Sequence, residues 1–293
     1  MPPSIPPDNF LGLPHRFADY ATARFAVLPV PYEATTTYGS GTREGPRAII
    51  SASQQVELYD EELGRESFRA GIATLDPLEP DARGPAEMQA RVYAAARKVA
   101  RDGKFLLSLG GEHSITGALV RAAKARSRKL SVLQIDAHAD LRDSYQGTPW
   151  SHASVMRRVR DLGVPVVGVG IRNYSAEEAR FLRQSGQPIF TSRMCHESPT
   201  WIEEAAAKLT GDVYVTIDID GFDPAYAPGT GTPEPGGLDW RQVTSLLRRV
   251  CKQRHVVGAD IVEVRPIPPG HQTEYLAARL AYKIIAYNQA TSE

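Results

Sequence analysis

The chain has 293 residues, and equal numbers of basic and acidic residues give it a formal net charge of zero at pH 7. This balance argues against nucleic acid as the main partner, and the apolar runs are too short to span a bilayer. A hydrophobic fraction of 42% indicates a globular protein with a sizeable core. With no secretory signal in the N-terminal sequence and only two cysteines, Cys195 and Cys251, we expect a cytoplasmic protein without a disulfide framework.

Apolar, β-branched segments alternate with helix-like segments along most of the chain. Nearly continuous apolar runs of this kind are typical of strands that are buried on both faces of a sheet. The expected strands are residues 24–30, 71–75, 104–110, 130–136, 164–171, 187–190, 212–220 and 255–264. The helix-like segments include residues 85–101, 115–126, 175–185, 200–209, 239–252 and 273–289.

This alternation predicts an α/β protein with a parallel sheet and crossover helices. The pattern alone does not distinguish an open, doubly wound sheet from a closed barrel. In both architectures, functional residues gather at the carboxyl ends of the strands. Residues 1–16 are rich in proline and are expected to form an irregular arm. Because no repeat or linker divides the rest, residues 17–293 are expected to form a single domain.

Acidic residues and histidines directly follow several of the expected strands. Residues two apart in an extended segment face the same way, so Asp136 and His138 can converge on one point, as can Asp218 and Asp220. Clustered carboxylates are costly to bury without a positive partner. The motifs are "GGEHS" (110–114), "DAHAD" (136–140) and "DIDGFDP" (218–224), and each follows a predicted strand.

Together these motifs offer six candidate metal ligands. Four of them are carboxylates, whose charge of −4 matches two divalent cations. Mostly oxygen ligands with only two imidazoles favour Mn²⁺ over a thiolate-type zinc site. A helix cap or a turn would explain one such motif alone, but not all three. The candidate ligands are His113, Asp136, His138, Asp140, Asp218 and Asp220.

The segments "GGEHS", "DAHADLRD" and "TIDIDGFDPAYAPGTGTPEPGGL" resemble, in this order, the signature segments of the ureohydrolases, the arginase and agmatinase family. The likeness extends from residues 38–49 to residues 260–266. It implies a three-layer arginase-like fold with a mainly parallel, eight-stranded sheet flanked by helices. It also implies two Mn²⁺ ions per chain, bridged by Asp136 and Asp218, which support hydrolysis of a guanidino group to urea and an amine. Members of this family usually form homotrimers or homohexamers.

The resemblance implies further site residues. His152 in "TPWSHASVMRR" matches the family's proton-shuttling histidine, and Glu263 matches the carboxylate that holds the guanidinium group. The ordinary alternatives are a helix-start histidine without a role and an ion pair between Glu263 and Arg265. Asp223 is expected to support the metal ligands. The candidate catalytic residues are His152, Glu263 and Asp140, and the candidate substrate-binding residues are Glu263, Thr232, His152 and Trp150.

The loop before His152 bears on the substrate. Residues 143–151 lack the asparagines with which arginases hold arginine, and they contain no cation. We therefore expect agmatine as the substrate, with putrescine and urea as products. Aminopropyl-agmatine, guanidinobutyrate, guanidinopropionate and arginine stay open as alternatives. Two rival classes are a single-zinc, deacetylase-like amidohydrolase, which would need fewer of these ligands, and a non-catalytic metal-stabilised protein, against which His152 and Glu263 argue.

Overall fold

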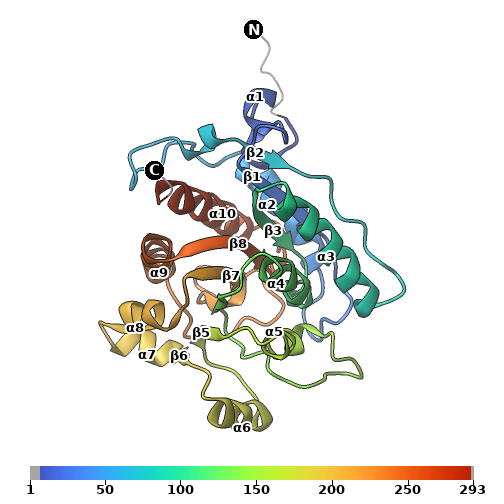
Figure 1. Ribbon diagram of the computed structural model, residues 1–293, viewed down its shortest axis with the longest axis vertical. Helices are drawn as coiled ribbons and strands as arrows, with labels where there is room; N and C mark the ends of the chain where they lie inside the picture. The colour runs from blue at the N-terminus through green and yellow to red at the C-terminus, as the bar shows by residue number, and fades with distance from the viewer. Residues whose placement is uncertain (1–6, 292–293) are drawn as a thin grey trace.

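The structure is a computed structural model that describes residues 7–291. An eight-stranded sheet runs through the molecule (Figure 1). Its strands are β1 Phe25–Val30, β2 Ile72–Thr74, β3 Phe105–Gly110, β4 Leu130–Ile135, β5 Val166–Ile171, β6 Ile189–Thr191, β7 Asp212–Asp218 and β8 His255–Val262. They lie in the order β2-β1-β3-β8-β7-β4-β5-β6, and every neighbouring pair is parallel. Because β2 and β6 end this order without pairing with each other, the sheet is open and not a barrel.

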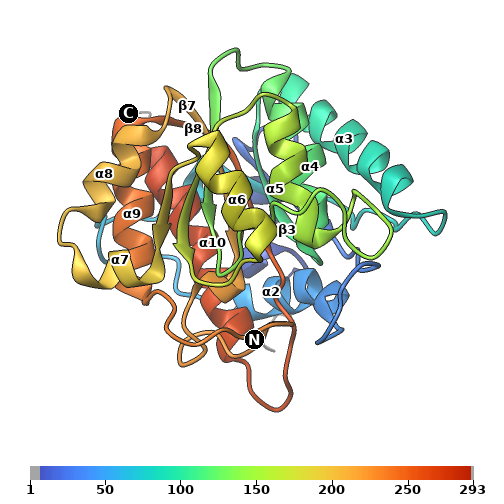
Figure 2. The same ribbon diagram turned by 90° about the horizontal axis from the view of Figure 1, so that it is seen from below.

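Helices cover both faces of the sheet, as the two views at right angles show (Figure 1 and Figure 2). They are α1 His15–Ala18, α2 Gly45–Ser53, α3 Pro85–Arg101, α4 Thr116–Lys124, α5 Val155–Asp161, α6 Ala176–Ser185, α7 Ser192–Glu197, α8 Trp201–Lys208, α9 Trp240–Gln253 and α10 Gln272–Ala290. All eight expected strands and all six expected helices are present, with ends within two residues of the prediction. Helices α1, α2, α5 and α7 were not among the segments named from the sequence.

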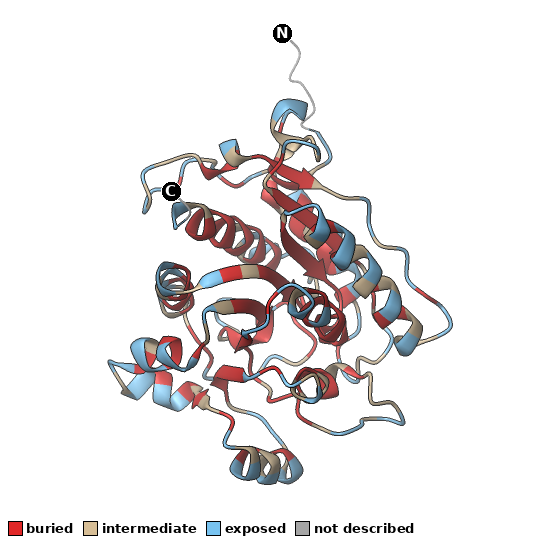
Figure 3. Cartoon of the chain, in the orientation of Figure 1, coloured by how far each residue is buried: buried red, intermediate tan, exposed pale blue. Residues whose placement is uncertain are grey.

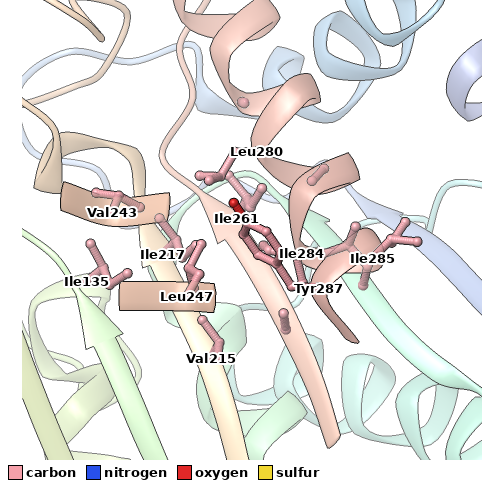
Figure 4. Packing of buried hydrophobic residues seen from close by; sticks show 14 of the residues in the cluster. Ile135, Val215, Ile217, Val243, Leu247, Ile261, Leu280, Ile284, Ile285 and Tyr287 are labelled. Carbon is pink, nitrogen blue, oxygen red and sulfur yellow. The ribbon is translucent and has the colours of Figure 1, made fainter. Parts of the chain in front are cut away.

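Two separate apolar clusters pack the helices against the sheet, one on each face. On one face, Ile217 and Ile261 of the sheet lie in one cluster with Leu247 of α9 and with Leu280 and Ile284 of α10 (Figure 4). The other cluster joins the opposite face of the sheet to α3, α4 and α5. The expected three-layer α/β fold with an eight-stranded parallel sheet is therefore confirmed.

Burial follows this layered arrangement. The strands and most of α10 are buried, whereas α3 and α6 bury one side and expose the other (Figure 3). Two helices begin at a capping box. Ser175 and Glu178 form one at the start of α6, and Asp239 and Gln242 form one at the start of α9.

The N-terminal segment is partly integrated into this core. Phe10 and Leu13 are fully buried, so the described portion of the predicted arm packs against the rest of the chain. Residues 1–6 of that arm lie outside the described residues. The division into an arm (1–16) and one catalytic domain (17–293) stays a prediction. Within residues 7–291, no helix has the length and apolar character needed to cross a membrane.

Candidate active site

Four strands that are neighbours in the sheet carry the candidate site residues at their carboxyl ends. These strands are β3, β8, β7 and β4 (Figure 1). His113 follows β3, Glu263 follows β8, and Asp218 ends β7. Asp136 directly follows β4, with His138 and Asp140 in the loop beyond. Parallel pairing thus brings residues together that are more than one hundred positions apart in the sequence, as predicted from the strand-end motifs.

The first ligand group surrounds the buried ring of His113. Its Nδ1 lies 3.3 Å from Asp136 Oδ2, 3.1 Å from Asp140 Oδ2 and 3.4 Å from Asp218 Oδ2. Although this nitrogen is fully buried, it has no hydrogen-bond partner among the described residues. Three carboxylate oxygens facing an unsatisfied imidazole nitrogen are a donor set that suits a divalent cation.

The second ligand group surrounds His138. Its Nδ1 lies 3.0 Å from Asp220 Oδ2 and 3.7 Å from Asp136 Oδ1. The two oxygens of Asp136 thus face different imidazoles, and Asp136 belongs to both groups whose ligand atoms lie within 4.8 Å of one another. Asp218 is placed beside His113, and its side chain also accepts the backbone N–H of Asp220 at 2.9 Å. The structure therefore contains two adjoining sites that are able to hold metal ions.

The ring of His113 is oriented by two residues that sequence reasoning missed. Its Nε2 lies 2.9 Å from the hydroxyl of Thr216, which donates a 2.6 Å hydrogen bond to the buried carboxylate of Asp260. Because the hydroxyl hydrogen is used for Asp260, Nε2–H donates to Thr216, which leaves Nδ1 to face the ligand group. Histidine ligands are commonly held in this way by a partner on the other ring nitrogen. The segment "DIVEVRP" (260–266) was quoted for its resemblance, but no role was assigned to Asp260.

Charge crowding perturbs the carboxylates. Burial, followed by the neighbouring charge of Asp136, raises the pKa of Asp140 to about 7. Burial, followed by Asp220 and Asp136, raises the pKa of Asp218 well above its usual range. Burial acts against ionisation of Asp136 too, but His113 and His138 hold its pKa below the usual value. Such a cluster is costly to keep fully ionised without positive charge, and bound cations would supply that charge.

Two of the site residues have a left-handed backbone, which is uncommon for residues other than glycine. Asp140 has φ 53° and Glu263 has φ 62°. Conformations of this kind cluster at functional sites, where the surrounding structure has to hold them. Glu263 is held by the backbone N–H of His113, which donates to its Oε1 at 2.7 Å. Burial raises the pKa of Glu263 well above its usual range.

A cavity of about 180 Å³ opens over both ligand groups. Its lining includes His152, Glu263 and Thr232, and Thr232 donates a 3.3 Å hydrogen bond to Asp220. Burial, followed by the charges of His113 and His138, lowers the pKa of His152 to about 4, so its ring is neutral at pH 7. The structure does not bring Trp150 into this lining; Tyr145 lies there instead, with its ring edge-on to that of His152.

One cation also lines the cavity. Arg142 precedes loop 143–151, and its guanidinium group lies 4.8 Å from the centre of the Tyr145 ring. The argument from residues 143–151 therefore missed a cation of the cavity lining, because Arg142 lies just before that loop. Arg157 and Arg158 do not line the cavity; both form ion pairs with Asp143 on the surface.

Asp223 has a different place from the one expected. Its carboxylate accepts the backbone N–H groups of Ala225, Gly236 and Gly237 and so ties together the two ends of the loop that carries Thr232. No contact between Asp223 and a candidate metal ligand is found in the described part of the chain. Asp223 supports the shape of this loop and does not orient a ligand directly.

A model of the arginase family matches residues 23–286. The chain is 42% identical to the N(1)-aminopropylagmatine ureohydrolase of Synechocystis sp., with 96% of each chain covered. It is 34% identical to the agmatinase of Pyrococcus horikoshii, with 91% of this chain and 93% of the other covered. The crystal structure of the agmatine ureohydrolase of Thermoplasma volcanium superposes with a TM-score of 0.87 at 33% identity, over 98% of this chain and 95% of the other. The chain belongs to the arginase family, the ureohydrolase family that its motifs resemble.

Proposed function

We propose that this protein is a ureohydrolase that binds two Mn²⁺ ions per chain and hydrolyses an amine-tailed guanidino compound to urea and an amine. The observation that carries this proposal is the pair of ligand groups that share Asp136 at the base of a cavity lined by His152 and Glu263. A single-zinc, deacetylase-like site is disfavoured because two groups are present.

The proposed ligands divide between the two sites. His113, Asp136, Asp140 and Asp218 would hold one ion, and Asp136, His138, Asp218 and Asp220 would hold the other. Mn²⁺ fits because four of the six ligands are carboxylates and none is a thiolate. A pair of divalent ions lowers the pKa of water and so supplies a strong nucleophile at neutral pH.

The chain's own residues bind the substrate and move its protons. The Glu263 carboxylate suits the planar N–H face of a guanidinium group. The Thr232 hydroxyl donates to Asp220, so its oxygen is available to accept an N–H of the same group. His152, neutral at pH 7, accepts a proton and returns it to the tail nitrogen as the bond from that nitrogen to the guanidinium carbon breaks. The amine then leaves uncharged, urea keeps the oxygen of the water through the new C–O bond, and the second proton of the water passes to solvent. Asp140 contributes to catalysis as a ligand, and we assign no substrate contact to Trp150.

The site residues constrain the tail of the substrate less than they constrain its guanidino group. Agmatine is favoured by the absence of arginine-binding asparagines in loop 143–151. N(1)-aminopropylagmatine is the second candidate, and it is favoured by the higher identity to the relative named for that substrate, 42% against 34% for the agmatinase. Tyr38, Tyr145 and Tyr174 line the cavity, and aromatic rings bind ammonium groups. A homotrimer or homohexamer and a cytoplasmic location stay predictions.

Urea release from a panel of guanidino compounds tests the proposal. The Mn²⁺-loaded protein is assayed with agmatine, N(1)-aminopropylagmatine, guanidinobutyrate and arginine, with Asp136→Asn as the inactive control. We expect the highest kcat/KM for one of the two amine-tailed compounds. Absence of urea from every compound would overturn the reaction class, whereas a preference for arginine or guanidinobutyrate would overturn only the tail assignment.

A further inference from the structure

The hydroxyl of Thr35 lies between a buried carboxylate and the imidazole of His152. Thr35 Oγ1 donates a 2.9 Å hydrogen bond to Glu112 Oε1 and lies 3.1 Å from His152 Nδ1. The backbone N–H of His152 donates to the same oxygen at 3.1 Å. Glu112 follows β3 and Thr35 follows β1, so this chain of contacts joins two neighbouring strand ends to the cavity.

Glu112 accepts four hydrogen bonds, which is the full capacity of an ionised carboxylate. Its Oε2 accepts the backbone N–H groups of Ala34 and Thr35, both at 2.6 Å. Its Oε1 accepts the hydroxyls of Thr35 and Ser114, at 2.9 Å and 2.5 Å. The side chain is completely buried. With every acceptor position used, the hydroxyl hydrogen of Thr35 is committed to Glu112.

The approach of these two segments depends on Gly111. A Cβ at this position would lie 2.1 Å from the carbonyl oxygen of Tyr32, so a larger residue would push the segments apart. Glycine at 111 therefore lets the residue after it reach the loop that carries Thr35.

The hydrogen-bond directions fix the tautomer of His152. A threonine hydroxyl has one hydrogen and two acceptor positions. Since the hydrogen points to Glu112, the oxygen accepts from His152, both from its backbone N–H and from Nδ1. Nδ1 must then carry a hydrogen, and a neutral ring keeps its lone pair on Nε2. The same arrangement, a hydroxyl between a buried carboxylate and an imidazole, joins Asp260 and Thr216 to His113.

We propose that Glu112 and Thr35 are positioning residues that hold His152 as the Nδ1–H tautomer, with Nε2 available to the substrate. This inference rests on the proposed function for its catalytic meaning, but the tautomer itself can be measured without activity. Nε2 takes up one proton from the attacking water and gives one proton to the departing amine. The ring ends each cycle as it began, and the Nδ1 hydrogen never leaves. The second proton of the water leaves the urea oxygen to solvent, so no further reactant is needed.

The tautomer is tested by long-range ¹H–¹⁵N NMR of histidine-labelled protein, loaded with diamagnetic Mg²⁺ and with His152→Ala used for assignment. We expect a protonated Nδ1 and an unprotonated Nε2 for His152 at pH 8. Glu112→Gln should reverse this. Its amide oxygen has to face the N–H groups of Ala34 and Thr35, so its NH₂ donates to Thr35, which then donates to Nδ1. An Nε2–H tautomer in the unaltered protein would overturn the proposal.

Kinetics of Thr35 variants provide the second test. Thr35→Val should lose the tautomer preference and lower kcat roughly 10- to 100-fold, less than complete loss of a positioned acid or base, while KM and ion content change little. Thr35→Ser, which keeps the hydroxyl, should restore both. Ser151→Ala is the matched control, because Ser151 Oγ lies farther from Nδ1, at 3.4 Å, and its removal should leave the tautomer unchanged.

Two outcomes separate this inference from the proposed function. A folded Thr35→Val protein with the tautomer and the kcat of the unaltered chain would overturn the role of Thr35. An unaltered chain that releases no urea from any guanidino compound would overturn the proposed function, whereas the NMR result would still decide whether Glu112 and Thr35 set the tautomer.

Discussion

The hydroxyl of Thr216 donates a 2.6 Å hydrogen bond to the carboxylate of Asp260, and both side chains are fully buried. The same oxygen accepts from His113 Nε2, so this pair determines which nitrogen of His113 faces the carboxylate cluster. A metal ligand that is oriented in this way loses affinity for its ion when the partner is removed.

We therefore predict that Thr216→Val weakens binding of an ion in the His113 ligand group by roughly 10- to 100-fold. Calorimetric titration of Mn²⁺ into the metal-free variant measures this change. Thr216→Ser, which retains the hydroxyl, is the matched control and should bind as the unaltered chain does. Equal affinity of the valine and serine variants would show that the hydroxyl does not orient His113.

Replacing His152 should affect turnover and not metal binding. His152→Ala is expected to lower kcat by roughly 10²–10⁴, the usual contribution of a positioned acid or base, because the amine then leaves without a proton donor. Ion content, measured by elemental analysis, should stay the same. His255→Ala is the control, since His255 lies at the opposite, amino-terminal end of β8 and pairs with Asp212. A turnover number unchanged by His152→Ala would show that His152 is a helix-start residue without a catalytic role.

Ion affinity should depend on pH in a direction set by Asp140. Burial raises the pKa of this carboxyl to about 7, so a proton has to leave before Asp140 coordinates an ion at lower pH. We expect Mn²⁺ affinity to fall, and proton release per ion to rise, as the pH is lowered from 8 to 6. The same shift makes the ion-free protein lose stability as the pH rises from about 4 to about 7, because the unfolded chain gives up this proton first.

Calorimetry in buffers of different ionisation enthalpy counts the released protons directly. Asp140→Asn should reduce the number of released protons by the share of this carboxyl while leaving the His138 group intact; Asp218, whose pKa is also raised by burial, keeps its own share. Mn²⁺ binding with the same affinity and the same proton count at pH 6 and pH 8 would contradict this assignment.

Arg142 gives a test of the substrate tail. Its positive charge at the cavity disfavours an ammonium tail and favours a carboxylate tail. Arg142→Met should therefore raise the ratio of kcat/KM for agmatine to that for guanidinobutyrate by roughly 2- to 5-fold, the range expected for a solvent-accessible charge pair. Arg157→Met is the control, because Arg157 pairs with Asp143 and Asp161 away from the cavity. A fall in agmatine turnover with Arg142→Met alone would indicate that Arg142 binds the substrate by another contact.

The strand ends were predictable because their signal is local. An apolar run that ends in Asp136 or Asp218 marks both the strand and its functional end, and parallel pairing then places those ends together. Helix α5, Val155–Asp161, was harder to recognise because it is short. It directly follows the 3-10 turn His152–Ser154, which comes after loop 143–151.

Contacts between distant segments could not be read from spacing. Thr35 and Glu112 are 77 positions apart, and Thr216 and Asp260 are 44 positions apart. When a threonine and a buried acid are far apart in the sequence, no sequence pattern indicates whether they form a hydrogen bond or are ordinary core residues. Loop side chains raise the same difficulty: the direction of Trp150, Tyr145 and Arg142 depends on how the loop folds, which the sequence pattern does not specify.

The most direct test of the two-ion site is stepwise addition of Mn²⁺ to metal-free protein while urea release from agmatine or N(1)-aminopropylagmatine is followed. Because Asp136 faces both imidazoles, we expect the two ligand groups to act as one centre that needs both ions. We predict that the rate of urea release reaches its plateau at two ions per chain. A plateau at one ion per chain, with a second ion adding no activity, would contradict the two-ion centre.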